Sequence, residues 1–331
     1  MKNPLVSVIV VNWNGKGYLD TCLSSLKNQS FSDIEIVVVD NGSADGSVEF
    51  IEKNYPDIRV IKNIKNYGFA TGNNIGIKAS KGKYIATLNN DAMAERDWIK
   101  NLIGVAEKRE DIAMFAPKIL SYSNAGLIES SGMLVYPDAI AKCRGYLEKD
   151  GEKYNRMENI LLPSACAALY RKDALFAAGL FDDDYFAYCE DIDLGLRIRM
   201  LGFGCIYVPE AKVYHHHSAT SRNNLPFKMY LIERNRLWTL LKIFPWTNLI
   251  SSPIYTLKRY LSYCCAVISR KDQPNQFYKK TSGFTIAFIL LKICGSTALN
   301  LINLSKKRSQ IMRNKKMNKK IIAKLFQSIK N

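Results

Sequence analysis

Apolar residues in the first hundred positions follow two different spacings. Short continuous apolar runs, typical of strands buried on both faces, alternate with stretches whose apolar residues recur at helical intervals. The runs predict strands at residues 5–11, 34–39, 59–62 and 84–88, and the intervening stretches predict helices at 17–28, 46–54 and 71–79. Strands and helices that alternate at this spacing predict an α/β fold whose sheet is mostly parallel, with right-handed crossovers.

The pattern changes twice further along the chain. The expected elements after residue 96 are helices at 97–108, from Lys172, from Glu190 and at 226–243, and strands at 112–119 and 206–208. Two apolar stretches follow, at 246–268 and 283–304, and then a Lys-rich amphipathic tail. We therefore expect a first domain over residues 1–225, with halves at about 1–92 and 93–225, and a basic helical extension over 226–331.

The net charge of +17 is concentrated in that extension. Residues 1–233 hold 27 basic and 29 acidic side chains, whereas residues 234–331 hold 20 basic side chains and one acid. Such a segment favours an anionic surface, either lipid headgroups or nucleic acid. Nucleic acid is disfavoured because the body is slightly acidic and the basic residues after 305 have only one aromatic among them, Phe326.

Three interpretations of the extension remain open. The apolar stretches form helices that lie in a membrane interface, or one of them spans a membrane, or they pack on the first domain. The first is favoured because Lys258, Arg259 and Lys292 interrupt the stretches. The N-terminal residues read as a strand and not as a signal peptide, so we expect a cytoplasmic protein, peripheral on the inner face of the cytoplasmic membrane.

Composition excludes several other classes. Hydrophobic residues at 47% and charged residues at 23% are ordinary globular values, not those of a disordered or collagen-like chain. The eight cysteines contain no CxxC pair, so neither a zinc site nor a disulfide framework is expected.

Polar residues stand where the predicted strands end, which is where parallel sheets bind ligands. They are Asn12, Asn14, Asp40, Asn41, Asn89, Asn90 and Asp91. Asp40 precedes a Gly/Ser turn that enters a helix, so it suits a nucleotide base or ribose, although a plain turn capped by Asp45 explains the same residues. Asn89 and Asp91 suit a divalent metal that also takes diphosphate oxygens, and a polar strand end without metal is the alternative.

Two further motifs carry candidate chemistry. Six carboxylates lie between residues 182 and 193, interleaved with aromatic residues, which suits a sugar site, whereas capping acids of an ordinary helix are the plainer interpretation. His215, His216 and His217 follow a strand, and one or two of them could ligate a metal or orient a phosphate.

Together these motifs resemble glycosyltransferase family 2, with its GT-A fold, and most closely its rhamnosyltransferase-like branch. The resemblance runs over about residues 5–243 and rests on segments 6–15, 37–47, 66–76, 88–91, 179–182, 190–197 and 233–235. It implies an inverting glycosyltransferase that moves a sugar, rhamnose favoured, from a dTDP- or UDP-sugar to a glycan or lipid-linked acceptor. The halves 1–92 and 93–225 would then bind nucleotide and acceptor.

The resemblance also implies residue roles. Asp191 would be the general base, with Glu190 beside it, and Asp91 with His215 would hold Mg²⁺ or Mn²⁺, His216 being a near-equal candidate. The implied donor-binding residues are Asn12, Asn14, Asp40, Asn41, Gly68, Asn74, Asn90 and Asp91. This chain has Asn89 where the family often has a first aspartate, which leaves one metal carboxylate.

Other classes fit less well. A nicotinamide dehydrogenase would need a G-x-G-x-x-G turn after the first strand, and residues 12–17 do not supply it. A catalytically degenerate scaffold or a membrane-binding protein is the remaining alternative, and the joint presence of Asp40, Asp91 and Asp191 disfavours it.

Overall fold

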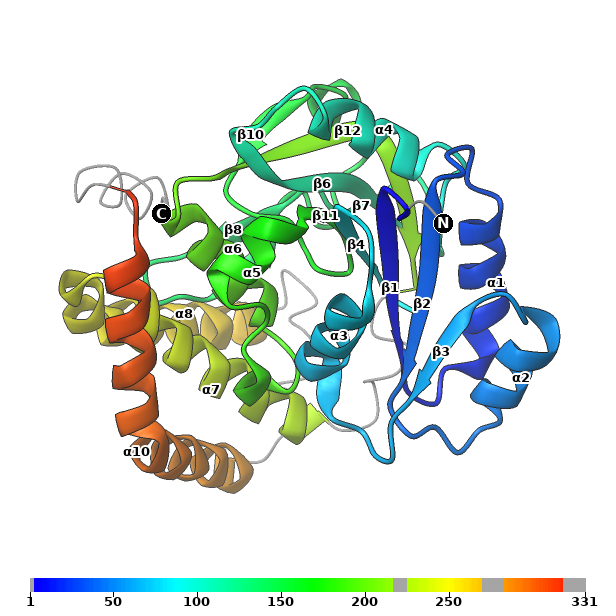
Figure 1. Cartoon of the computed structure of the whole chain (residues 1–331). Coiled ribbons are helices and arrows are strands. Elements are labelled where there is room, and N and C mark those ends of the chain that lie inside the picture. Colours follow the sequence, from blue (N-terminus) through cyan, green and yellow to red (C-terminus); the bar gives the residue numbers. More distant parts are fainter. Residues whose placement is uncertain (1–2, 217–224, 270–282, 318–331) are drawn as a thin grey trace. The chain divides into compact units, whose positions relative to one another are not determined.

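The computed structural model describes residues 3–216, 225–269 and 283–317. They divide into two compact units: Met1–Leu134 with Lys142–Thr220, and Val135–Ala141 with Ser221–Asn331. The first contains the sheet and its helices, and the second is built from helices (Figure 1).

The elements before the helical unit are, in chain order, β1 (Val6–Asn12), α1 (Lys16–Lys27), β2 (Ile34–Asp40), α2 (Ser47–Asn54), β3 (Arg59–Lys62), α3 (Gly68–Ala79), β4 (Tyr84–Leu88), β5 (Ala92–Ala94), α4 (Trp98–Ala106), β6 (Ile112–Ser121), β7 (Ile128–Ser130), β8 (Met133–Val135), β9 (Ala141–Cys143), the 3₁₀ turn η1 (Glu152–Tyr154), β10 (Glu158–Ile160), β11 (Ala167–Arg171), α5 (Lys172–Ala178), the 3₁₀ turn η2 (Asp183–Tyr185), α6 (Glu190–Met200) and β12 (Gly204–His215). Every strand and helix predicted from the apolar spacing up to residue 208 is present.

The central sheet has the strand order β10-β12-β6-β11-β4-β1-β2-β3, with β5 paired to β12 and β7 to β6. Strands β4, β1, β2 and β3 are mutually parallel, as expected from strands joined by helical crossovers. The predicted α/β class is confirmed. The antiparallel strand β11, between β4 and β6, was not predicted, because its short run Ala-Ala-Leu-Tyr lies in an irregular stretch.

Alternate residues of the buried strands enter two different hydrophobic cores. Val8 and Val10 of β1 pack with α1, α2 and α4, whereas Ile9 packs with α3, α5 and α6. The sheet is therefore covered by helices on both faces, which is why its strands read as continuous apolar runs and not as alternating ones. The uncovered ends of the strands are the places left for a site.

The helical unit contains α7 (Leu225–Ile243), α8 (Trp246–Ser269) and α10 (Gly283–Asn314). Trp238 of α7 donates a hydrogen bond from Nε1 to Oγ1 of Thr297 on α10, at 3.1 Å, and Arg308 of α10 donates to the carbonyl of Leu241. Among the described residues, α10 is the one helix long and apolar enough to cross a membrane, judged by length and composition alone, over Phe284–Asn314. Part of the expected Lys-rich tail, residues 318–331, lies outside the described residues.

Candidate functional site

A hydrogen-bonded chain of polar side chains joins the ends of three neighbouring strands. Asn12 lies opposite Asp40 in the parallel pairing of β1 and β2, and its Nδ2 donates to Asp40 Oδ2 at 2.8 Å. Asn90, just beyond β4, donates from Nδ2 to Asn12 Oδ1 at 2.8 Å. All three side chains are buried, so the strand ends predicted to carry the site do meet.

The turn after β2 closes over Asp40. Ser43 donates to the Asp40 carboxylate from both its backbone N–H, at 2.9 Å, and its hydroxyl, at 2.7 Å. Asn14 in turn binds this turn, because its backbone N–H donates to Ser43 Oγ and its Oδ1 accepts from the backbone of Ala44. A nucleotide that hydrogen-bonds to Asp40 therefore has to compete with Ser43.

Beyond the strand ends, Asp91 forms a buried line of three charged or titratable groups with His215 and Glu129. His215 Nε2 lies 3.0 Å from Asp91 Oδ1, and its Nδ1 lies 2.6 Å from Glu129 Oε1. Burial pushes the pKa of His215 down, but neighbouring Cys166, Asp91 and Glu129 outweigh that effect and raise the pKa well above its ordinary value. His215 is the last residue of β12, so this strand runs further than the predicted strand at 206–208.

These residues fit a divalent cation held by few protein ligands. A cation at this place would displace the proton between His215 Nε2 and Asp91, and the Nδ1–H donated to Glu129 would then hold the Nε2 lone pair toward it. Among the described residues no set of three His, Cys, Asp or Glu side chains is arranged as a metal cage. Two protein ligands suit Mg²⁺ or Mn²⁺, which fill their remaining positions with water and phosphate oxygens.

The histidine next along the chain faces a different environment. The ring of His216 stacks on Tyr122, with ring centroids 3.7 Å apart, and lies 5.2 Å from the ring of Tyr18. Its backbone N–H donates to the carbonyl of Asp91. The side chain of His215 is therefore the one paired with Asp91, and His217 lies outside the described residues.

The predicted catalytic pair opens helix α6. Asp191 Oδ2 accepts a hydrogen bond from the backbone N–H of Ala165 at 3.3 Å. Oε2 of Glu190 is buried and has no hydrogen-bond partner among the residues that the structure describes. Burial raises the pKa of Asp191. Burial and the adjacent Asp191 charge raise the pKa of Glu190 well above its ordinary value, so two neighbouring carboxyls are set to ionise at different pH values.

The other acids of this segment have structural partners. Asp193 pairs with Arg197 one helical turn on, at 2.8 Å, and Asp183 accepts hydrogen bonds from Thr71 and Asn74 of α3. Asp182 caps η2 by accepting from the N–H of Asp184. Three of the six acids therefore fit the structural arrangement that the plainer interpretation described, and Glu190 and Asp191 lie at the start of α6.

Helix α3 holds the segment that leads into α6. Asn74 donates from Nδ2 to the carbonyl of Phe181 and accepts from the N–H of Phe181 through Oδ1, at 2.8 and 3.0 Å. Asn41 donates to the carbonyl of Gly68 and accepts from Asn63, so it fixes the start of α3. These amides, predicted to bind a donor, are engaged with protein groups, and we infer that they position the loops around it.

The loop itself carries backbone strain. Phe186, Tyr188 and Cys189 have φ angles of 63°, 69° and 64°, in the left-handed region that non-glycine residues rarely adopt. Strain of this kind persists only where surrounding contacts impose it, and it concentrates at functional sites. Such contacts include the hydrogen bond that the backbone N–H of Ala70 donates to the carbonyl of Phe186, and the packing of Phe186 against Gly68.

We expect Gly68→Ala to lower stability by about 1–3 kcal/mol. Gly68 has φ +86°, and a Cβ there would overlap the carbonyl oxygen of Phe186. Gly104→Ala is the matched control, because Gly104 lies in α4 with nothing near its Cβ position, and it should raise stability by about 0.5–1 kcal/mol. Urea unfolding of both variants measures the difference, and equal midpoints would contradict the packing role of Gly68.

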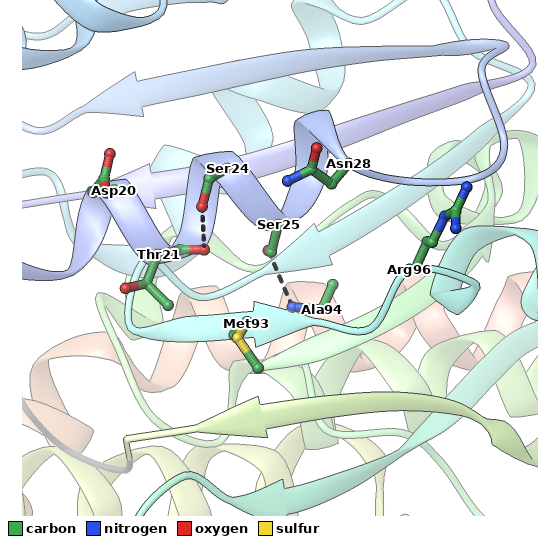
Figure 2. A pocket seen from close by; sticks show the side chains of 8 residues that line it. All are labelled: Asp20, Thr21, Ser24, Ser25, Asn28, Met93, Ala94 and Arg96. Atoms are coloured by element: carbon green, nitrogen blue, oxygen red, sulfur yellow. Dashed lines mark hydrogen bonds between the residues drawn. The ribbon is translucent and has the colours of Figure 1, made fainter.

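A cavity of about 560 Å³ lies elsewhere in the same unit, between α1 and the β5 segment (Figure 2). Its lining residues are Asp20, Thr21, Ser24, Ser25, Asn28, Met93, Ala94 and Arg96. Ser24 and Ser25 bond to backbone groups, and Asp20 accepts a hydrogen bond from Tyr55. None of the predicted site residues lines this cavity, so the polar strand ends define the candidate site.

The fold agrees with comparisons to known proteins. The sequence model of the family described as "Glycosyl transferase family 2" matches residues 7–176, about half of the chain, and the chain belongs to this family. Its fold is that of GT-A glycosyltransferases: the crystal structure of GalNAc-T7 with UDP, GalNAc and Mn²⁺ superposes with a TM-score of 0.58 over 72% of this chain and 48% of that one, at 17% identity.

Two relatives in sequence are named as glycosyltransferases. An uncharacterized glycosyltransferase of Haemophilus influenzae is 32% identical over 223 residues, 63% of this chain and 64% of that protein. The N-acetylglucosaminyl-diphospho-decaprenol L-rhamnosyltransferase of Mycobacterium tuberculosis is 27% identical over 241 residues, 64% of this chain and 76% of that protein. The matched region of the first relative is therefore just under two thirds of its length.

Two contributors to the site escaped the sequence interpretation. Glu129 lies on β7, a strand of three residues whose order in the sheet no local pattern reveals. Ser43 was visible only as part of a turn. The one available signal for Glu129 was an isolated acid in an apolar segment, Leu-Ile-Glu-Ser-Ser, which has no specificity for chemistry.

Proposed function

We propose that this chain is an inverting glycosyltransferase that moves a sugar from a nucleoside-diphosphate donor to a glycan or lipid-linked acceptor. One observation carries the proposal: the three candidate acids are linked through hydrogen bonds and through residues that are neighbours in the chain. Asp40 leads through Asn12 to Asn90, beside Asp91. The backbone of Asn89 bonds to Cys166, whose neighbour Ala165 bonds to Asp191.

The donor would lie across the ends of β1, β2 and β4. Asp40 would accept hydrogen bonds from the nucleotide base, displacing Ser43, and Asp91 with His215 would hold Mg²⁺ or Mn²⁺. The bound cation would offset the negative charge that the leaving diphosphate gains. Asn12, Asn14 and Asn90 would keep the strand ends in register, and Asn41, Gly68 and Asn74 would hold the flanking loops.

Asp191 would act as the general base. The acceptor hydroxyl loses its proton to an Asp191 carboxylate oxygen while its own oxygen bonds to the anomeric carbon. The bond from that carbon to the diphosphate oxygen breaks in the same displacement, and the leaving nucleoside diphosphate keeps the electron pair. Burial and the charge of Asp191 disfavour the ionised form of Glu190 more strongly, so Asp191 would be the carboxyl of the pair that ionises first.

The finer identity of the substrates rests on relatives. The Mycobacterium protein is named for rhamnosyl transfer to a lipid-linked acceptor, which supports rhamnose here. The dTDP-sugar donor rests on the sequence resemblance, and the GalNAc-T7 structure with UDP supports a UDP-sugar as the alternative. A lipid-linked acceptor fits a cytoplasmic protein held on the inner membrane face by its basic C-terminal third.

Calorimetric binding of dTDP, UDP, GDP and CDP, each with and without Mn²⁺ or Mg²⁺, tests the proposal. Metal-dependent binding of one of them is the expected result, and dTDP would favour rhamnose. If none binds under any condition, the chain is a transferase-like scaffold and not an enzyme.

Glu129 is a positioning residue within this proposal, and Glu129→Gln should weaken Mn²⁺ affinity about 10–100-fold. The neutral amide no longer makes His215 a strong ligand, although it fills the same space. Electron paramagnetic resonance of free Mn²⁺ at fixed pH gives the affinity directly, without an activity assay. Glu148→Gln, at an exposed acid after the same segment, is the control. An unchanged affinity in a folded Glu129→Gln protein would remove Glu129 from the site.

A further inference from the structure

Helix α8 presents its apolar side chains outward and its polar side chains inward. The outward residues recur at helical spacing along one stripe and are each between 54% and 80% exposed: Trp246, Ile250, Ile254, Leu257 and Leu261. The opposite side faces the interior of the helical unit with Ser252, Thr256 and Arg259. A helix on a water-facing surface has the reverse arrangement.

A buried ion network fixes this rotation of α8. Arg259 donates to Asp138 at 3.1 Å and to Glu233 at 2.9 Å, and Arg236 donates to Glu233 at 2.8 Å. Thr256 adds a hydrogen bond to Asp138. Turning the helix to bury its apolar stripe would take Arg259 out of the network and leave Arg236 to compensate two buried acids. One buried negative charge would then be uncompensated, which costs several kcal/mol. The outward stripe is therefore built into the unit.

Helix α10 also exposes an apolar stripe, although its inner side is largely apolar as well. Its inner side packs in the unit with Ile289, Ile293, Thr297 and Leu304, and Lys292 lies over the ring of Tyr230 on α7. Its outer side carries a second stripe, each residue between 60% and 92% exposed: Phe284, Phe288, Leu291, Leu299 and Ile302. The inner side of α10 packs against α7. It is therefore not available to contact lipid, as all sides of a single membrane-spanning helix would be.

The charges around the two stripes indicate which kind of surface binds to them. Exposed basic side chains flank them, at Lys258 beside the first and at Lys306, Arg313 and Lys316 beyond the second. Residues 234–331 hold one acid, so a second copy of this chain would bring like charge against like charge. A bilayer with anionic headgroups accepts both the apolar stripes and the bases around them.

We propose that the stripes of α8 and α10 dock the helical unit on an anionic lipid surface, with both helices lying in the interface. The inference deepens the proposed membrane location and rests on it, but it is independent of the proposed transfer chemistry. It assigns lipid contact to ten named side chains and not to basic residues alone.

The test is flotation of the full chain with phosphatidylcholine vesicles, with and without phosphatidylglycerol. Two variants remove one stripe each, Ile250→Ser with Ile254→Ser, and Phe288→Ser with Leu291→Ser. Each should partition onto the anionic vesicles at least about tenfold more weakly than the unchanged chain. Ile64→Ser is the matched control, because Ile64 is 90% exposed in the other unit and should change nothing.

Several outcomes overturn the proposal and are distinguishable. If the unchanged chain fails to float, the membrane location fails with it, whereas nucleotide binding still tests the enzyme separately. If the chain floats and both stripe variants float equally well, the membrane location stands, but the stripes of α8 and α10 are not the lipid-binding surface. Equal binding to vesicles without phosphatidylglycerol would contradict the proposed preference for anionic lipid. A lipid-free dimer that the α8 variant converts to monomer, seen by sedimentation, would assign the stripe to a second copy.

Discussion

Replacing Asp191 by asparagine should reduce sugar transfer by about 10²–10⁴-fold while leaving donor affinity unchanged. Asparagine has the size of aspartate and can still accept the hydrogen bond from Ala165, but it cannot take the acceptor proton. Steady-state kinetics with the donor that the nucleotide panel identifies, together with calorimetry, separate the two effects. Retained donor binding is the distinctive part, because a merely structural acid would lose both.

The pH profile of the unchanged enzyme adds an independent check. Burial raises the pKa of Asp191, so the carboxylate needed as base forms only above an ordinary aspartate pKa. The rate should therefore rise with pH at higher pH values than it would for an exposed aspartate base. The residual rate of the Asp191→Asn variant should lack this rise. Asp57→Asn, at an exposed acid outside this segment, is the control and should keep both rate and profile. Donor affinity that falls in parallel with rate would contradict the base assignment.

Replacing Asp91 by asparagine should abolish the metal-dependent part of nucleotide binding. Changing a group that only supports a metal ligand costs about 10–100-fold in affinity, so losing the one ligand carboxylate should cost at least as much. Calorimetry with and without Mn²⁺ measures it: the variant should bind the nucleotide equally, and weakly, under both conditions.

The controls for Asp91 are direct. Asp57→Asn removes one negative charge from an exposed position in the same unit and should leave metal-dependent binding intact. Asp91→Asn also removes the charged partner of His215, so its fold is checked by thermal unfolding before binding is compared. If metal still strengthens nucleotide binding in a folded Asp91→Asn protein, the cation lies elsewhere.

Local sequence patterns predicted most helices and strands of the first unit, because the burial of each element determines the spacing of its own apolar residues. Strands buried on both faces have to be apolar at every position, and the helices between them need one apolar face, so β1 to β4 and α1 to α3 are readable from spacing alone. Asp40 at the end of β2 and Asp91 after β4 were expected at the same end of the sheet, because the carboxyl ends of parallel strands lie together. The strands that were not predicted are short, and non-local pairing, not periodicity, defines them.

The sequence by itself thus determined the fold class, the family and the residues that gather at one edge of the sheet. Only the tertiary structure decided what each polar group does there, because hydrogen-bond partners such as His215 with Glu129, or Asn74 with Phe181, are brought together across long separations in the chain. The same holds for α8. Its amphipathic pattern is visible in sequence, but which side faces inward depends on Asp138 and Glu233, two acids from other segments that hold Arg259 in the interior.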